Sequence, residues 1–123
     1  MKRVIGIGGI FLKCRDVDQT RAWYSRHLGV SLESWGAQFH FKDEPNPEAY
    51  SVLSFFKRST DYFDPSDSPF MLNLRVDDLE ALVAELRREG IELIGEPMVE
   101  EYGKFAWLLD PEGNKIELWE QGK

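Results

Sequence analysis

Glu117 is the residue whose surroundings in this sequence point most directly to chemistry. It lies in DPEGNKIELWE, residues 110–120, where a turn-forming pentapeptide precedes an apolar run that one carboxylate interrupts. Side chains alternate between the two faces of a strand, so Lys115, Glu117 and Trp119 would share one face, opposite the two apolar residues between them. A carboxylate beside a tryptophan can attract a cation, accept a hydrogen bond or take a proton from a substrate.

The other candidates for nucleophile or metal ligand are few. Cys14 is the single cysteine, which excludes an intrachain disulfide and a thiolate metal site and favours a reducing cytoplasm. His27 falls at the end of a predicted helix, where an imidazole commonly interacts with the helix dipole. His40 alternates with Phe39 and Phe41 on a predicted strand, where it can face a cavity. The sequence contains no phosphate loop, nucleophile elbow or complete dinucleotide fingerprint.

The charge balance argues against two classes of partner. The chain has 15 Lys and Arg residues against 22 Asp and Glu residues, a formal net charge of −7. It therefore lacks the clusters of Lys and Arg that binding to nucleic acid or to an anionic membrane surface requires. Its 123 residues, 42% hydrophobic and 30% charged, predict a single globular domain over 1–123. No stretch approaches the roughly 20 apolar residues of a membrane span.

The first half predicts one strand, one helix and three more strands. The opening strand covers 7–14, and the helix RDVDQTRAWYSRHLG follows, with Asp16 or Asp18 as its N-cap and Gly29 as its stop. The further strands are expected at 30–35, 37–42 and 50–57. A polar segment with two prolines, at about 58–69, is the predicted linker to the second half.

The second half repeats this order of elements. FMLNLRV, residues 70–76, is strand-like, and DDLEALVAELRREG is the clearest helix. Its apolar residues recur at i, i+3, i+4 and i+7, namely Leu79, Leu82, Val83 and Leu86. Asp77, three residues before Glu80, resembles a capping box. Strands are expected at 91–94 or 96–100, at 104–109 and at 114–120.

Aligning the two halves strengthens this pattern. At an offset of 63, Ser54 falls on Glu117, and at an offset of 62, Gly9 falls on Met71. The sequence therefore predicts an α+β fold made of two βαβββ modules, one at about 5–57 and one at about 70–120. We expect their curled sheets to surround a cavity, with the helices on the outer face.

This organisation resembles the vicinal oxygen chelate superfamily, which includes glyoxalase I, extradiol dioxygenases, fosfomycin-resistance enzymes and bleomycin-resistance proteins. The resemblance covers about 5–120 and rests on the strings IFLKCRDVDQTRAWYSRHLGV and LLDPEGNKIELWE. Enzymes of the superfamily hold a divalent metal at four strand positions, which map here to Gly9, Ser54, Met71 and Glu117. Only Glu117 can be a ligand, whereas such a metal needs about three His or carboxylate ligands. Because the chain departs from the superfamily's ligand set, we expect no bound metal, and we expect no other cofactor. A second identical chain would add only the same residue types.

Strand alternation from these positions predicts a face with aromatic walls and a few polar groups, as in a small-molecule pocket. The facing of Trp35 and Trp107 stays open, and any one aromatic could belong to the core or to a dimer interface instead. The linker residues Tyr62 and Phe63 are expected to cover the cavity mouth or to pack against a partner. The predicted ligand-binding residues are Phe11, Trp35, His40, Ser54, Phe56, Asn73, Arg75, Trp107, Glu117 and Trp119.

Three roles are open for Glu117: a structural residue paired with Lys115, Lys13 or Arg75, a polar anchor for a ligand, or a general base. The favoured function is metal-independent binding or sequestration of an aromatic or cationic small molecule by a cytoplasmic homodimer, similar to bleomycin-resistance proteins. The alternative is a glyoxalase-like lyase or isomerase that uses a displaced metal site or Glu117 as base. A third possibility is a subunit whose interface is the functional surface. The ligand's identity, and whether modules pair within or between chains, stay open.

Overall fold

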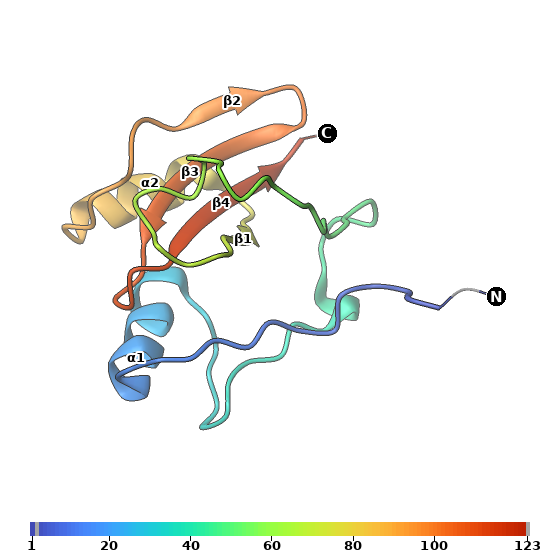
Figure 1. The fold of residues 1–123 in the computed structure, drawn as a ribbon, viewed down its shortest axis with the longest axis horizontal. Helices are drawn as coiled ribbons and strands as arrows, with labels where there is room; N and C mark the ends of the chain where they lie inside the picture. Colours follow the sequence, from blue (N-terminus) through green and yellow to red (C-terminus); the bar gives the residue numbers. More distant parts are fainter. Residues whose placement is uncertain (2, 123) are drawn as a thin grey trace.

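The computed structural model describes residue 1 and residues 3–122, so Lys2 and Lys123 of the predicted 1–123 domain lie outside the described residues. The predicted α+β class is confirmed: two helices accompany a four-stranded mixed sheet with the strand order β1-β4-β3-β2. None of the helices in the described part of the chain has the length and apolar character to cross a membrane. In chain order the elements are α1 (Val17–Leu28), η1 (Phe41–Asp43), β1 (Leu72–Arg75), α2 (Leu79–Arg88), β2 (Met98–Glu100), β3 (Gly103–Leu109) and β4 (Lys115–Gln121) (Figure 1).

The sheet belongs to the second module, and a tight turn sets its register. β1 pairs with β4 in parallel, and β3 pairs antiparallel with both β4 and β2. The turn between β3 and β4 is the predicted DPEGN segment, in which the Asp110 N–H donates to the Asn114 carbonyl at 2.9 Å and the Gly113 N–H to the Asp110 carbonyl at 3.0 Å. Asp110 Oδ1 also accepts hydrogen bonds from the backbone amides of Glu112 and Asn114. This turn places Glu117 opposite Trp107.

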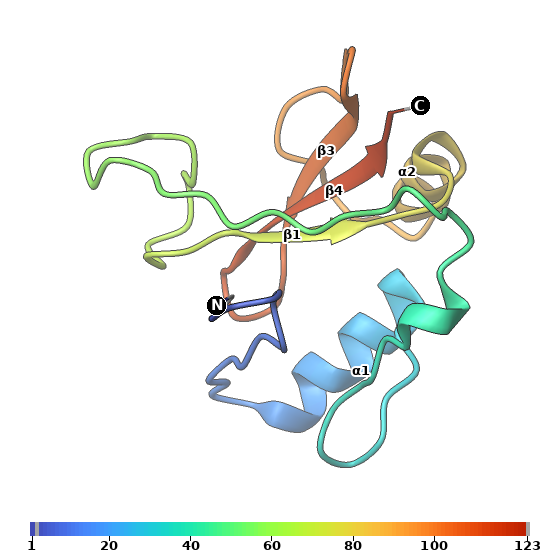
Figure 2. The same ribbon diagram turned by 90° about the vertical axis from the view of Figure 1, so that its right-hand side faces the viewer.

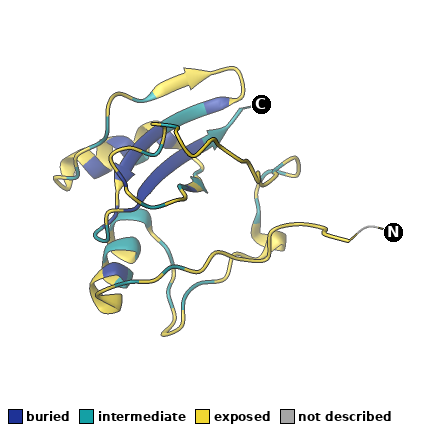
Figure 3. Cartoon of the chain, in the orientation of Figure 1, coloured by how far each residue is buried: buried dark blue, intermediate teal, exposed yellow. Residues whose placement is uncertain are grey.

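The core lies between α2 and one face of the sheet. The predicted apolar stripe of α2 is confirmed, with Leu79, Val83 and Leu86 buried. Burying each such side chain contributes about 1.5–3 kcal/mol. In Figure 3 the dark blue of buried residues is concentrated on α2, β3 and β4. Among the described residues the buried cluster comprises Leu72, Leu79, Val83, Leu86, Ala106, Leu108, Ile116 and Leu118.

Both helices begin at an aspartate that caps free backbone amides. Asp16 caps α1, because its carboxylate accepts from the Gln19 N–H at 3.0 Å. Gly29 ends α1 with φ of 66°, a left-handed conformation that suits glycine. The capping box predicted at Asp77 was wrong by one residue, since Asp78 is the N-cap of α2. The Asp78 side chain accepts from the Ala81 N–H at 3.1 Å.

The strands predicted in the first module were wrong. The segments 7–14, 30–35 and 50–57 form no ladder, and 37–42 ends in the 3-10 turn η1. Glu33 and Gly36 form only an isolated bridge around the turn at Trp35. β-branched and aromatic residues favour an extended backbone, but a strand exists only when a second strand satisfies its N–H and C=O groups. Within the described residues these segments find no such partner, and most of them are exposed (Figure 3).

The first module contacts the second through α1. Leu12, Trp23, Tyr24 and Leu28 pack against the edge of the buried cluster. Figure 2 shows α1 below the strands, with its C-terminal end toward α2. At that end the His27 Nδ1 lies 2.7 Å from a carboxylate oxygen of Glu89. The helix predicted in the first half is thus formed and anchored, although its neighbouring strands are not.

Candidate functional site

The candidate site lies on the face of the sheet opposite α2. The residues between those of the buried cluster point to this face, so Lys115, Glu117 and Trp119 of β4 lie on it together. Glu117 pairs in register with Asn73 of β1 on one side and with Trp107 of β3 on the other. The centre of the sheet therefore presents a carboxylate between an amide and an indole.

Glu117 is 7% exposed and accepts hydrogen bonds from three neutral donors. Its Oε2 accepts from the Tyr62 hydroxyl at 2.5 Å and from Trp107 Nε1 at 2.9 Å. Its Oε1 accepts from Asn73 Nδ2 at 2.7 Å. A buried carboxylate is costly unless such bonds compensate its lost hydration. Because a carboxylate has about four acceptor positions, these three hydrogen bonds leave about one position of Glu117 unused.

Lys115 places a positive charge beside this carboxylate. Its Nζ donates to the Tyr62 carbonyl at 2.6 Å and lies 5.3 Å from the centre of the Tyr62 ring and 6.0 Å from that of Trp107. Burial lowers the pKa of Lys115, and the charge of Glu117 opposes that shift. Lys115 therefore fixes the linker backbone in front of the sheet, which was not a role that the sequence suggested.

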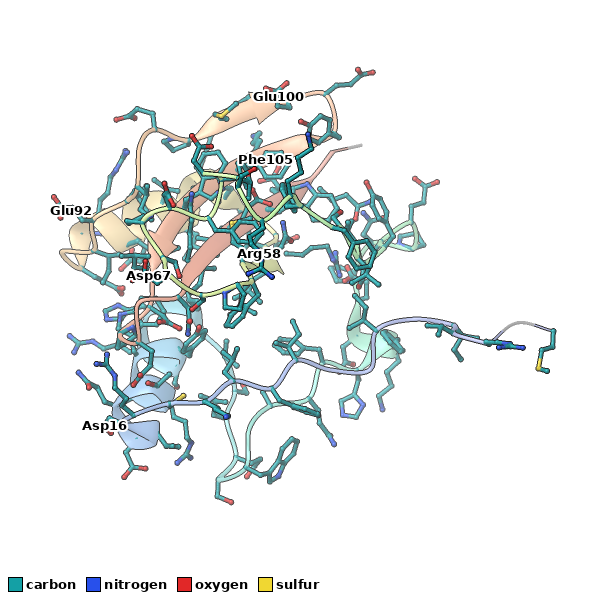
Figure 4. All side chains as sticks on the ribbon, in the orientation of Figure 1. Asp16, Arg58, Asp67, Glu92, Glu100 and Phe105 are labelled. Carbon is teal, nitrogen blue, oxygen red and sulfur yellow. The ribbon has the colours of Figure 1, made fainter. Side chains whose placement is uncertain are left out.

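Tyr62 reaches Glu117 from the linker, which crosses this face of the sheet (Figure 1). Its ring stacks on Phe56 with centroids 5.6 Å apart and an interplanar angle of 10°, and meets Trp107 edge-on at 6.4 Å. Burial and the hydrogen bond to Glu117 raise the pKa of Tyr62, so the phenol keeps its proton and stays a donor. Figure 4 shows the linker, labelled at Arg58, over the side of the sheet where Phe105 is labelled.

Parallel aromatic rings extend the site along the strands. Phe105 lies 6.4 Å from Trp107 with an interplanar angle of 12°, and 6.3 Å from Trp119 with an angle of 5°. Trp119 Nε1 donates to the Tyr102 carbonyl at 3.2 Å. Gly103 permits this packing, because a Cβ there would lie 2.4 Å from Trp119 Nε1. The rings of Trp107, Phe105 and Trp119, called the aromatic row below, form an apolar wall beside Glu117.

The structure brings together only some of the predicted ligand-binding residues. Asn73, Trp107, Glu117 and Trp119 share this face, and Phe56 joins them through Tyr62. Arg75, also predicted to bind ligand, forms an ion pair with Glu44, which does not favour the alternative that Arg75 pairs with Glu117. The remaining predicted residues are exposed and are not among the hydrogen-bond partners of Glu117: Phe11, Trp35, His40, which directly precedes η1, and Ser54. A role of any of these residues in binding stays a prediction.

The side chains around Glu117 are not suited to hold a divalent metal. In the part of the chain that the structure describes, no three His, Cys, Asp or Glu side chains are grouped so that they could hold one ion. The neighbours of Glu117 are a phenol, an amide and an indole, and the indole N–H and the amide NH₂ are donors rather than metal ligands. The positions Gly9, Ser54 and Met71 bring no carboxylate or imidazole.

Sequence reasoning missed two contacts that connect distant segments. The bond between Tyr62 and Glu117 was signalled only by an aromatic residue within a polar linker. The DPEGN turn was predicted as a turn, but its contacts with α1 were not. Arg15 and the Asp16 backbone amide both donate to Glu112 at 3.1 Å.

A groove of about 260 Å³ lies elsewhere, between α2 and the chain around β2. It is lined by residues such as Val83, Met98 and Lys104 and does not include Glu117. This groove is therefore separate from the candidate site.

A mixed sheet with one helix-covered face and one aromatic face makes this a small α+β scaffold, which is consistent with the vicinal oxygen chelate superfamily. The chain belongs to the glyoxalase-like domain family, which it matches over residues 9–119. The solved structures that share its fold include the following three. TnmS3, an antibiotic-binding protein from a Streptomyces species, is 24% identical, with a TM-score of 0.54 over 87% of this chain and 88% of that one.

The other two structures come from mobile metagenomes. A protein from the mobile metagenome of V. Pseudocholerae is 18% identical, with a TM-score of 0.57 over 98% of this chain and 100% of that one. An integron cassette protein from V. Cholerae is 18% identical, with a TM-score of 0.56 over 96% and 98% of the two chains. No curated protein sequence matches the chain.

Proposed function

We propose that the chain binds an aromatic or cationic small molecule at the face around Glu117, without a metal ion, and so sequesters or carries it. The observation that carries this proposal is the buried carboxylate with one acceptor position left beside the aromatic row. Apolar walls with a few oriented polar groups are typical of small-molecule sites. That TnmS3 is an antibiotic-binding protein supports a related role for this chain.

Calorimetric titration of the chelator-treated protein with aromatic probes tests this function. We expect saturable binding that Phe105→Leu weakens about tenfold, since a ring in the aromatic row is lost. Phe41→Leu is the matched control, because Phe41 is 90% exposed on η1. Binding that appears only after addition of Zn, Ni, Mn or Fe would contradict metal independence.

We also propose that the chain works as a homodimer, in which a second copy covers the extended segments of the first module. Phe11 is 97% exposed and Phe55 is 89% exposed, and both lie in segments whose backbone has no strand partner among the described residues. A second copy would cover the rings and supply the missing hydrogen bonds. Phe55→Asp should then yield monomers in sedimentation, whereas Val99→Asp, on the exposed β2, should leave the dimer intact.

A reducing cytoplasm is the proposed compartment, supported by the free Cys14. Expression with a fluorescent tag, followed by microscopy and fractionation, tests the location. A signal in the membrane or in the medium would contradict it.

The alternative function is a glyoxalase-like lyase or isomerase with Glu117 as general base. The observation in its favour is the 2.5 Å contact between the Tyr62 hydroxyl and Glu117 Oε2, which puts a proton directly against the carboxylate. Against it, Oε2 already accepts a second hydrogen bond, from Trp107. Turnover of an aldehyde or keto substrate that disappears in Glu117→Gln would favour this alternative over binding alone.

A further inference from the structure

Tyr62 lies on the solvent side of Glu117 and Trp107. It is 38% exposed, whereas Glu117 and Trp107 beneath it are buried. The backbone of the linker that carries it is held by local turns, such as the bond from the Asp64 N–H to the Asp61 carbonyl, and by the bond from Lys115 Nζ to the Tyr62 carbonyl, and not by a strand ladder. The Tyr62 side chain can therefore leave the face without breaking the sheet that positions Glu117.

The phenol of Tyr62 provides both a planar ring and a hydroxyl donor to this face of the sheet. The hydroxyl donates to Glu117, one ring face lies against Phe56, and the ring meets Trp107 edge-on. A planar ring is thus accommodated in front of Glu117 with its hydroxyl hydrogen-bonded to the carboxylate.

We propose that Tyr62 is an internal substitute for the ligand, and that the ligand is a planar aromatic compound with a phenolic hydroxyl that displaces Tyr62 and donates to Glu117. This inference rests on the proposed function, which it narrows from aromatic or cationic ligands to phenols. Tyr62 then competes with the ligand, and its removal strengthens binding.

The charge next to Glu117 decides against a cationic ligand. The Lys115 ammonium lies 5.3 Å from the centre of the Tyr62 ring, the volume that the ligand's ring would fill. A second cation there would meet a like charge in a partly buried site, which is unfavourable. A neutral phenol keeps the cation–π contact with Lys115 and replaces the hydroxyl of Tyr62 as donor.

The competition predicts a specific rank order of affinities. The apparent affinity of the wild type is lowered by the fraction of molecules in which Tyr62 has left the face. Tyr62→Ala removes this penalty, so it should bind 2-naphthol at least about tenfold more tightly than the wild type. Tyr62→Phe loses the hydroxyl but keeps the ring, so its affinity for 2-naphthol should lie between those of the wild type and Tyr62→Ala. Phe39→Ala, which truncates an exposed ring outside the cluster, should bind as the wild type does.

Calorimetric titration with 2-naphthol and 2-methoxynaphthalene tests both parts of the proposal. The two probes share a ring system, but only 2-naphthol has a hydroxyl donor. We expect Tyr62→Ala to prefer 2-naphthol about tenfold, as for a hydrogen bond to a charged group, and the further change Glu117→Gln to remove most of this preference. Near-ultraviolet circular dichroism shows that each variant is folded.

Each outcome separates this inference from the proposed function. If Tyr62→Ala binds 2-naphthol no more tightly than the wild type, Tyr62 is only a wall of the site. The proposal that Tyr62 occupies the place of the ligand is then overturned. Equal affinity for both naphthalenes would overturn the phenol class alone. If 2-naphthylmethylammonium is the only probe that binds, the general function holds and the inference fails. If no probe binds any variant, the proposed function fails as well. Should Tyr62→Ala not fold, Tyr62→Phe must still exceed the wild type.

Discussion

The Tyr24 hydroxyl donates a hydrogen bond of 2.6 Å to Asp110 Oδ2, and this bond joins α1 to the turn between β3 and β4. Burial and the bond to Asp110 raise the pKa of Tyr24, so the phenol keeps its proton at neutral pH and donates to Asp110. Glu112 extends the same junction by binding the start of α1, where Asp16 is labelled in Figure 4. The DPEGN turn therefore connects the two halves of the chain as well as setting the register of β4.

Glu112→Gln should destabilise the protein at neutral pH. It should also make the free energy of unfolding depend less steeply on pH in the acid range. Hydrogen bonds from the backbone amides of Arg15 and Asp16, with the Arg15 guanidinium, lower the pKa of Glu112 to about 2. The folded pKa lies below the ordinary value of 4.5, so the unfolded chain binds the proton first as the pH falls. The stabilisation is complete above pH 4.5 and is lost toward pH 2. Urea unfolding across this range measures it.

The exposed Glu100→Gln, on β2, is the control for this experiment and should match the wild type at every pH. A stability difference between Glu112→Gln and the wild type that stays constant from pH 6 to pH 2 would contradict the role given to Glu112.

Glu117→Gln should lower the free energy of unfolding by about 1–3 kcal/mol. The carboxylate accepts from Tyr62, Asn73 and Trp107, whereas a glutamine has one acceptor oxygen and turns an NH₂ group toward donors. Denaturant unfolding measures the change. The exposed Glu92→Gln should stay within about 0.5 kcal/mol of the wild type, and a similar loss in both variants would show that the three bonds contribute little.

Tyr62 should remain protonated in the folded protein at pH values where an ordinary tyrosine ionises. Its pKa is raised above the usual 10 by burial and by the bond to Glu117. The folded state therefore holds the proton more tightly, so this contribution to stability is present below pH 10 and is lost as the pH rises above it.

Ultraviolet absorbance of the phenolate checks this prediction. Folded Tyr62→Phe and wild type should show the same change near pH 10, but in urea the variant should lack the contribution of one tyrosine. A smaller change in the folded variant would mean that Tyr62 ionises normally and that its bond to Glu117 is weak.

Gly103→Ala should destabilise the protein by about 1–3 kcal/mol and change the fluorescence of Trp119. Gly103 has φ of 148°, and a Cβ would lie 2.4 Å from Trp119 Nε1 and 2.5 Å from the Glu120 carbonyl. Gly8→Ala is the control, because its Cβ would meet no atom within 4 Å. Thermal unfolding with fluorescence detection compares them, and equal melting temperatures would argue against the close approach of Trp119.

Elements with a local signal were predictable from the sequence. The apolar spacing of α2 and the caps of α1 depend on neighbouring residues. The predicted bounds of both helices therefore lie within a few positions of the observed ones. Alternation in β4 correctly placed Glu117 and Trp119 on one face, because the DPEGN turn fixes the register. The first-module strands were wrong because pairing requires a distant partner that no local pattern specifies.

The contacts of the site also divide into those that local sequence patterns predict and those that depend on distant segments. The positions of Asn73 and Trp107 beside Glu117 arise from sheet register, which alternation makes accessible. The bond from Tyr62 depends on the path of a linker rich in proline, serine and aspartate, whose residues favour turns of many shapes. Its target therefore could not be read from the sequence.

The confinement of the buried cluster to 72–118 among the described residues divides the chain by local stability. Amide protons of β3 and β4 should exchange with solvent slowly, through opening of the sheet, and those of 5–14 and 50–57 quickly, through local fluctuation. A ligand or second chain that orders the fast-exchanging half would then bind with an unfavourable conformational entropy and a large negative change in heat capacity. The exposed segments 5–14 and 50–57 would thus make such an association resemble coupled folding in calorimetry.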